Sequence, residues 1–380
     1  MGHDKLRKFA ENETFSCLLQ PSAAELLADG FFALRDHAVK GHWNGTMFDA
    51  ARPVVLELGC GKGEYTIDLS RREPSCNYIG VDIKGARLWK GAKYAHEHQL
   101  GNVAFLRTRI EFIGAFFAPS EVSQIWLTFS DPQLKSENSR LTSPVFLERY
   151  RQFLQPGGIV HLKTDSRFLY EYSLAVARCN GLRVLAATPD LYATPREELF
   201  GAGMRQSGTG LQRAESFTPS GECTLQSGAA LPPAGVPAGG DGASAGAFHE
   251  GSQSAPAAAL SLPAVNALYE VQTFYERMFR AQGYKICYLA FTLDHEGPFE
   301  HPTLEEFDPV YWRSVEGPRH FATPPDTIVA AGTAADAAAA VVAAGSAADA
   351  AAAVVAAGSA ADAAENGTAA GAAEVGVAAK

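Results

Sequence analysis

A glycine-rich loop between two acidic side chains is the first place in this sequence where chemistry can be expected. The apolar run Pro53–Leu58 leads directly into Gly59-Cys60-Gly61-Lys62-Gly63. A helical pattern follows from Glu64 to Ser70, and a second apolar run, Tyr78–Val81, ends at Asp82. We expect a strand, a tight turn, a helix and a second strand. Glycines let the backbone of such a turn approach a ligand closely, and an acid at the tip of the second strand suits a ribose diol.

Two adenosine-containing cofactors could use this loop. A dinucleotide needs G-x-G-x-x-G, whose third glycine lets the helix pack closely beneath a pyrophosphate. The loop reads G-C-G-K-G-E, with no glycine at that position, and Glu57 lies just before it. An anionic side chain there suits the cationic amino end of S-adenosylmethionine better than a diphosphate. The pattern E-x-G-x-G-x-G followed by V-D-I therefore favours a methyltransferase over an NAD enzyme, while glycines that merely end a strand are the plain structural alternative.

A second candidate site follows the apolar run Gln124–Phe129, where the sequence continues Ser130-Asp131-Pro132-Gln133-Leu134-Lys135. Ligands of open α/β sheets bind beyond the carboxyl ends of the strands, so Asp131 is expected where a methyl group would be delivered. An ordinary turn fixed by Pro132 is the alternative. The turn lacks the second proline and the aromatic residue of enzymes that methylate exocyclic amines, which argues against an adenine or cytosine amine as the target.

A third polar cluster ends the next strand pattern, in which Gly157–Leu162 precedes Lys163-Thr164-Asp165-Ser166. We expect Asp165 at the same edge of the sheet as Asp131. The alternative is a helix N-cap, because Asp165 or Ser166 could begin the helix that runs through Tyr172.

Composition divides the chain of 380 residues into unlike parts. Residues 201–264 are rich in Gly, Ala, Pro and Ser and cannot bury enough apolar area to offset the entropy of ordering them, so we expect a disordered insertion. From about Ala322 the chain is an Ala-rich tail with a 13-residue repeat, as in Ile328–Ala340 and Val341–Ala353. Residues 265–321 return to globular composition, with a helix expected over Tyr269–Phe279 and a strand over Lys285–Leu293.

The formal charge of -10 at first argues against a nucleic-acid partner. Seven of these net charges, however, belong to the insertion and the tail. The segment Lys84–Arg109 carries six basic residues against Glu97 alone, and such a cluster either contacts phosphates or forms a solvated helix face. Six cysteines without a C-x-x-C pair, and an N-terminus without the apolar stretch of a signal peptide, predict a reducing, cytoplasmic protein without a metal.

These elements together predict one discontinuous α/β domain of the class I S-adenosylmethionine-dependent methyltransferase type. We expect a Rossmann-like, seven-stranded, mostly parallel sheet with helices on both faces. The domain would consist of residues 51–200 and 265–321, preceded by an N-terminal segment, residues 1–50.

The motifs, in their order, resemble the bacterial tRNA (guanine-N7)-methyltransferase family. They include M-G-H-D-K-L-R-K-F-A, V-L-E-L-G-C-G-K-G-E-Y-T, I-W-L-T-F-S-D-P-Q-L-K, H-L-K-T-D-S and T-F-Y-E. The resemblance covers residues 1–200 and 265–295. The family commonly reads F-P-D-P-W-P-K, where this chain has Ser130, Gln133 and Leu134, so the tRNA contacts of this loop would differ.

The resemblance implies methyl transfer from S-adenosylmethionine to N7 of a guanosine in the tRNA variable loop, position 46 of the tRNA. It implies Asp131 as the catalytic residue. It implies cofactor-binding positions at Glu57, Gly59, Gly61, Gly63, Asp82, Thr108, Arg109 and Asp131, with a backbone contact to the adenine at Thr108 and Arg109, since the family's acid is missing there. It implies substrate-binding positions at Lys135, Asp165, Thr273, Phe274, Tyr275 and Glu276. The partner would be tRNA, with no membrane and no obligate protein partner, and the protein would be a monomer or homodimer.

The chemistry of guanine fits these side chains. Its N7 has a free lone pair, so alignment with the sulfonium methyl matters more than a strong base. A carboxylate can accept from N1–H and the 2-amino group together, which suits Asp165 and Glu276, with Thr273 assisting. Asp131 would lie near the ring, whose positive charge after methylation carboxylates stabilise. A methyltransferase for another RNA base or a small molecule, and a non-catalytic RNA- or S-adenosylmethionine-binding relative, are the alternatives.

Overall fold

The computed structural model describes residues 3–27, 34–201 and 260–316. All of them belong to one compact unit within residues 1–321. Most of the expected insertion (residues 202–259) and the whole repeat tail lie outside the described residues. No helix in the described ranges is long and apolar enough to cross a lipid bilayer.

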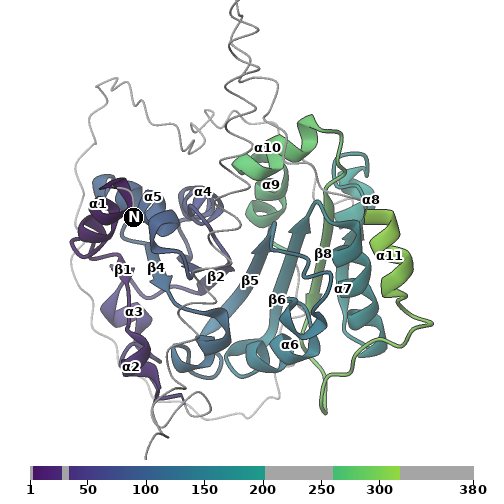
Figure 1. Ribbon diagram of the computed structural model, residues 1–380, viewed down its shortest axis with the longest axis horizontal. Coiled ribbons are helices and arrows are strands. Elements are labelled where there is room, and N and C mark those ends of the chain that lie inside the picture. Colours follow the sequence, from purple (N-terminus) through teal and green to yellow (C-terminus); the bar gives the residue numbers. More distant parts are fainter. Residues whose placement is uncertain (1–2, 28–33, 202–259, 317–380) are drawn as a thin grey trace, which may run out of the picture. The chain divides into compact units, whose positions relative to one another are not determined.

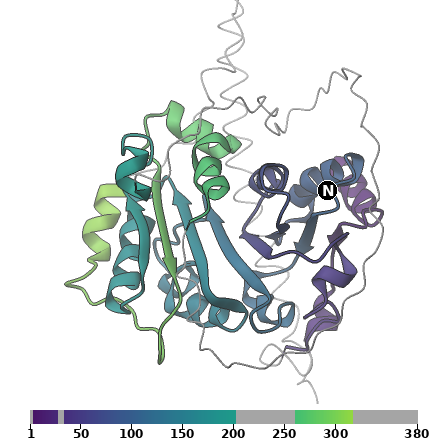
Figure 2. The same cartoon turned by 180° about the vertical axis from the view of Figure 1, so that it is seen from behind.

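A mostly parallel sheet forms the centre of this unit (Figure 1), with the strand order β1-β4-β3-β2-β5-β6-β8-β7. Strand β8 runs antiparallel to both of its neighbours, and the other neighbouring pairs are parallel. Figure 2 shows β8 between β6 and β7. The expected α/β sheet is therefore confirmed. The strands are β1 (Leu18–Leu19), β2 (Val54–Leu58), β3 (Asn77–Asp82), β4 (Val103–Arg107), β5 (Val122–Thr128), β6 (Leu154–Thr164), β7 (Val184–Thr188) and β8 (Cys287–Thr292).

The strand number differs from the expected seven, because the sheet formed by the described residues has eight strands. The additional strand, β1, has only two residues, and Leu18 and Leu19 pair with Phe105 and Leu106 of β4. Two residues are too few to show the alternation by which a strand is recognised in sequence.

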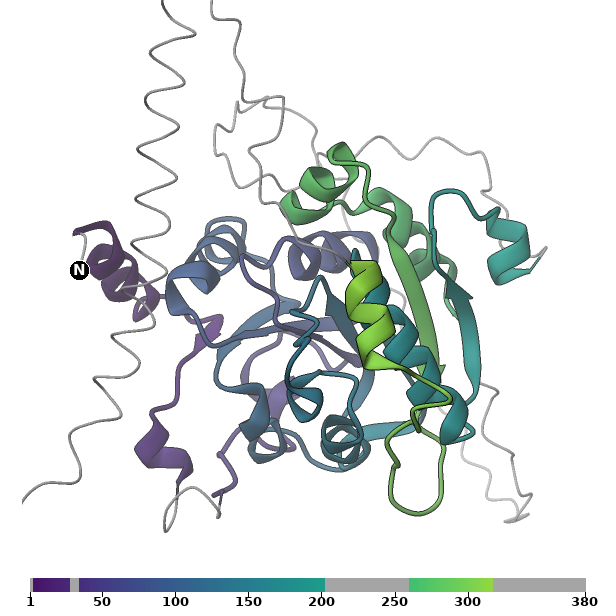
Figure 3. The same ribbon diagram turned by 45° about the vertical axis from the view of Figure 1, so that its right-hand side comes forward.

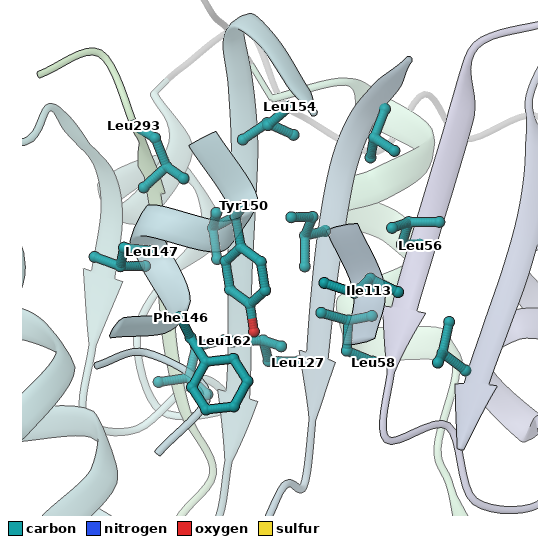
Figure 4. Packing of buried hydrophobic residues seen from close by; sticks show 14 of the residues in the cluster. Leu56, Leu58, Ile113, Leu127, Phe146, Leu147, Tyr150, Leu154, Leu162 and Leu293 are labelled. Atoms are coloured by element: carbon teal, nitrogen blue, oxygen red, sulfur yellow. The ribbon is translucent and has the colours of Figure 1, made fainter. Parts of the chain in front are cut away.

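Helices cover both faces of the sheet, which explains why β2 and β3 are buried along their whole length and why β2 reads as a nearly continuous apolar run. On one face, Leu56, Leu127 and Leu162 pack with Phe146 and Tyr150 (Figure 4). The helices are α1 (His3–Asn12), α2 (Ala23–Leu26), α3 (Trp43–Thr46), α4 (Glu64–Arg72), α5 (Gly85–Glu97), α6 (Pro144–Arg151), α7 (Arg167–Cys179), α8 (Arg196–Phe200), α9 (Leu262–Glu270), α10 (Phe274–Ala281) and α11 (Pro309–Glu316), with 3-10 turns η1 (Ile110–Ala115) and η2 (Glu137–Ser139).

The other face of the sheet is packed by α4 and α9, where Tyr65 and Leu69 join Trp126, Val265 and Leu268 in one apolar cluster. Helix α7 packs against β8 and β6, and α11 lies beside α7 (Figure 3). The chain that follows the expected insertion therefore completes both the sheet and its covering layers. It becomes helical at Leu262, slightly before the expected return at residue 265.

The single helix expected over Tyr269–Phe279 is wrong, because two helices, α9 and α10, meet at a bend. Thr273 has extended backbone angles at this bend, and its hydroxyl accepts a hydrogen bond from the backbone N–H of Glu276 at 3.2 Å. Thr273 is thus the N-cap of a new helix, and the hydrophobic period continues across the break without revealing it.

Candidate active site

The glycine loop between β2 and α4 has the backbone that only glycine adopts readily. Gly59, Gly61 and Gly63 have φ angles of 79°, 59° and 73°, in the left-handed region. A Cβ at Gly63 would also lie 2.6 Å from the ring of Phe105, so the start of α4 could not pack against the sheet with a larger residue. The loop therefore brings bare backbone to the carboxyl end of the central strands.

Asp82, the last residue of β3, is fixed beside this loop. Its Oδ2 accepts from the N–H of Gly61 at 3.0 Å, and its Oδ1 accepts from the N–H of Lys84 at 2.7 Å. Beyond the neighbouring strand β4, Thr108 is buried, whereas Arg109 is half exposed and pairs with Glu111 at 3.4 Å. The ribose contact of Asp82 and the adenine contacts of Thr108 and Arg109 stay predictions.

A pocket of about 470 Å³ opens at the carboxyl ends of β2, β5 and β6, with the start of α10 as its far wall. Figure 1 shows α9 and α10 beyond the ends of β5 and β6. The sequence-predicted residues that line the pocket are Glu57, Gly59, Gly61, Asp131, Asp165, Thr273, Phe274 and Tyr275. The predicted residues outside its lining are Gly63, Asp82, Thr108, Arg109, Lys135 and Glu276.

Glu57 is a buried carboxylate whose two oxygens are both hydrogen bonded. Oε1 accepts from the hydroxyl of Thr128 at the end of β5, and Oε2 accepts from the hydroxyl and, at 2.8 Å, the N–H of Thr66 in α4. Burial raises the pKa of Glu57 to about 7, although these hydrogen bonds oppose the shift. The side chain therefore ties β2, which leads into the glycine loop, to α4 and β5, and it lies where a bound cation would favour its ionised form.

Asp131 is exposed at the rim of the pocket, in a turn with unusual backbone angles. Its Oδ1 accepts from the N–H of Gln133 at 2.9 Å. Phe129 and Gln133, on either side, have φ angles of 52° and 47°, which non-glycine residues adopt at a cost of about 1–3 kcal/mol. Strain of this kind clusters at functional sites, and here it holds a carboxylate at the end of β5.

The helix-capping alternative for the end of β6 is settled in favour of Ser166. The Ser166 hydroxyl accepts from the N–H of Leu169 at 3.0 Å and caps α7. Asp165, which is 8% exposed, lines the pocket beside the turn that carries Asp131. The two carboxylates predicted at one edge of the sheet are thus brought to one cavity.

The segment Thr273–Glu276 divides into two environments. Thr273 lines the pocket, and so do Phe274 and Tyr275, which are both more than a third exposed. Glu276 is fully buried, accepting from Lys163 Nζ at 2.8 Å and from the Tyr192 hydroxyl at 2.6 Å. Glu276 therefore lies behind the pocket lining, and the guanine contact predicted for it stays a prediction.

Glu64, the first residue of α4, is a pocket residue that was not predicted from the sequence. It is 6% exposed and lines the pocket, and its Oε2 accepts from the backbone N–H of Phe274 at 2.7 Å. Burial raises its pKa. In the sequence, the sign of a pocket residue is that Glu64 directly follows Gly63 of the glycine loop. Glu64 thus connects the end of the glycine loop to the first N–H of α10, across the expected insertion.

Replacing Glu64 by alanine is expected to lower the free energy of unfolding by about 1–2 kcal/mol, since the N–H of Phe274 loses its acceptor in a largely buried place. Glu64→Gln keeps an acceptor oxygen and is the matched control, with less than half of that loss expected. Urea unfolding of both variants measures the difference. Equal losses in the two variants would contradict the assigned hydrogen bond.

Comparison with known proteins finds a matching family model and relatives that share one name. A family model described as "Putative methyltransferase" matches residues 51–198. The protein named tRNA (guanine-N(7)-)-methyltransferase in Christiangramia forsetii is 51% identical over 191 residues, which are 50% of this chain and 83% of that protein. Proteins of the same name in Bacteroides thetaiotaomicron and Cytophaga hutchinsonii are 48% and 40% identical, over 50% and 51% of this chain and 74% and 85% of theirs.

Each of these matches covers at least 74% of the relative's length. The likeness is therefore not confined to the short sequence motifs. The fold agrees as well, since a mostly parallel sheet carries the glycine loop at the carboxyl ends of its strands. The chain therefore belongs to the tRNA (guanine-N(7)-)-methyltransferase family.

Proposed function

We propose that this protein transfers the methyl group of S-adenosylmethionine to N7 of a guanosine in the variable loop of tRNA. The observation that carries the proposal is the pocket in which the glycine loop meets Asp131, Asp165 and Thr273. The loop offers close backbone approach to a cofactor, and the three side chains on the other walls offer acceptors to a base.

The cofactor would lie along the glycine loop, with its methionyl end toward Glu57 and its ribose toward Asp82. The buried Glu57 carboxylate suits a cationic amino group, and the fixed Asp82 carboxylate suits a diol. Thr108 and Arg109, directly after β4 and beside the end of β3, would contact the adenine through their backbone. The cofactor's sulfonium supplies the methyl group; the residues of this chain orient it.

Guanine would enter from the side of Asp131 and α10. Its N7 lone pair needs no base, so the rate depends on holding N7 in line with the methyl group. Asp165 would accept from N1–H and the 2-amino group, with the Thr273 hydroxyl beside it. Adenine lacks this pair of donors, and a site built to accept from two donors strongly rejects a ligand without them.

The tRNA backbone would lie over basic residues in and around the pocket. Lys135 is exposed next to the Asp131 turn, and Lys84 and Arg87 are exposed at the start of α5. Arg87 also lines the pocket, so basic charge continues from α5 to the reactive end. Such contacts position RNA without specifying its sequence.

We propose the cytoplasm as the compartment of this protein. The proposal is supported by the five cysteines of the described ranges, which are all free thiols, as is usual in a reducing compartment.

Transfer of labelled methyl from S-adenosylmethionine to unmodified tRNA, mapped by cleavage at 7-methylguanosine, tests the proposal. We expect one labelled guanosine in the variable loop, and no label in a matched tRNA with adenosine at that position. Label on a different base would replace the guanine proposal by another RNA methyltransferase. Absence of transfer to any tRNA would favour a small-molecule substrate or a non-catalytic binding role.

A further inference from the structure

Lys163, the next-to-last residue of β6, has a fully buried ammonium group whose donors are all satisfied. Its Nζ donates to the carbonyl oxygen of Leu268 at 2.7 Å, the carbonyl oxygen of Val271 at 3.3 Å and Oε2 of Glu276 at 2.8 Å. An ammonium has three N–H donors, and three acceptors meet them. A buried charge is tolerated only with such partners.

The three acceptors lie on both sides of the bend between α9 and α10. The carbonyls of Leu268 and Val271 belong to the last turn of α9 and the residue after it, where carbonyls lack partners within the helix and carry partial negative charge. Glu276 lies in the first turn of α10. One cation of the sheet therefore fixes the end of one helix and the start of the next.

Glu276 is also held from a third direction, because its Oε1 accepts from the hydroxyl of Tyr192 in the loop after β7 at 2.6 Å. The sequence T-F-Y-E is that of a capping box, in which the glutamate would bond back to the N–H of the threonine. Here the carboxylate is bonded instead to Lys163 and Tyr192, while the threonine hydroxyl still caps α10. The glutamate is thus used to fix the position of the bend.

We propose that Lys163 is a positioning residue, which acts through Glu276 and the α9 carbonyls to hold Thr273 and the start of α10 at the guanine-binding wall of the pocket. This inference rests on the proposed function. Thr273 lies in the bend, between Val271 and Glu276, and lines the pocket. A buried ion pair adds little net stability to a fold compared with apolar side chains of similar size. The effect that we assign to this pair is therefore to fix the geometry of the bend between α9 and α10.

Tyrosine variants provide the gentlest test. Tyr192→Phe removes one hydroxyl donor from Glu276 and leaves the pocket lining unchanged. Tyr288→Phe is its matched control, because the buried Tyr288 hydroxyl contacts His161, two residues before Lys163 on the same strand. We expect Tyr192→Phe to raise the KM for tRNA about 3-fold while the Kd for S-adenosylmethionine and kcat change less than about 2-fold, and Tyr288→Phe to change none of these.

The stronger variant is Lys163→Met, for which we expect a KM for tRNA raised about 10-fold or more in folded protein with unchanged cofactor affinity. A thermal melt and cofactor titration establish folding first. An unchanged KM in folded Lys163→Met would overturn the proposal. If that variant does not fold, equal KM values for Tyr192→Phe and Tyr288→Phe would overturn it. Failure of the proposed function is a separate result, visible as the wrong labelled base with the parent protein.

Discussion

Replacing Asp131 by alanine is expected to lower kcat for methyl transfer to tRNA by about 100-fold or more. Two effects combine in this variant. The carboxylate at the pocket rim no longer stabilises the positive charge that guanine acquires with the methyl group. The turn also loses the acceptor for the N–H of Gln133, so the left-handed backbone at Phe129 and Gln133 can relax. Single-turnover rates with saturating cofactor measure the loss, and affinity for S-adenosylmethionine should fall much less.

Asp131→Asn separates the two effects. The amide keeps an oxygen that can accept from the N–H of Gln133, so the turn is maintained and only the charge is removed. We expect a loss of about 10-fold, between the parent and the alanine variant, with an unchanged thermal unfolding midpoint. Full activity in Asp131→Ala would remove the catalytic assignment. Equal losses in both variants would assign the effect to charge alone.

The parts of the site that could be predicted from sequence are those whose chemistry is local. The glycine loop is recognisable because three positions with positive φ need glycine, and the acids are recognisable because they directly follow apolar runs. Parallel strands end at one edge, so Asp131 and Asp165 could be placed together without coordinates. The lining of the pocket by both Asp131 and Asp165 agrees with that prediction.

The parts that could not be predicted depend on contacts between distant segments. Lys163 reads as one more polar residue after a strand, because its partners Leu268, Val271 and Glu276 lie beyond the expected insertion. Glu64 reads as an ordinary first-turn acid for the same reason, since its partner is the backbone of Phe274. The spacing of apolar residues cannot reveal a helix break that the buried ammonium of Lys163 stabilises. For this reason one helix was expected where two, α9 and α10, are present.

The affinity for S-adenosylmethionine is expected to depend on pH through Glu57, with Kd rising about tenfold per pH unit as the pH falls below 7. Burial raises the pKa of this carboxyl to about 7 in the cofactor-free protein, so it is largely protonated in mildly acidic solution. A cationic amino group nearby favours the ionised form, and binding therefore releases a proton. Calorimetric titration of the cofactor between about pH 5.5 and 7.5, in buffers of different ionisation enthalpy, measures both the affinity and the proton release.

Glu57→Gln fixes this position in a neutral form and should remove the pH dependence, with an affinity at pH 7.5 about tenfold weaker than that of the parent. Glu64→Gln is the control, because burial also raises the pKa of Glu64 in the same pocket, and it should retain most of the slope. A pH-independent Kd in the parent, or an unchanged slope in Glu57→Gln, would contradict the assignment.

The same shifted carboxyl has an opposite effect on the stability of the cofactor-free protein. Because the pKa of Glu57 is higher in the folded than in the unfolded chain, its contribution is fully present below about pH 4.5 and is lost as the pH rises through about 7. The cofactor-free parent should therefore lose about 3 kcal/mol from this group over that range, and Glu57→Gln should not. S-adenosylmethionine would restore the loss at neutral pH, since it stabilises the form of Glu57 that burial disfavours. A buried carboxylate next to the glycine loop would thus make the empty site less stable under the conditions in which we expect the cofactor to bind best.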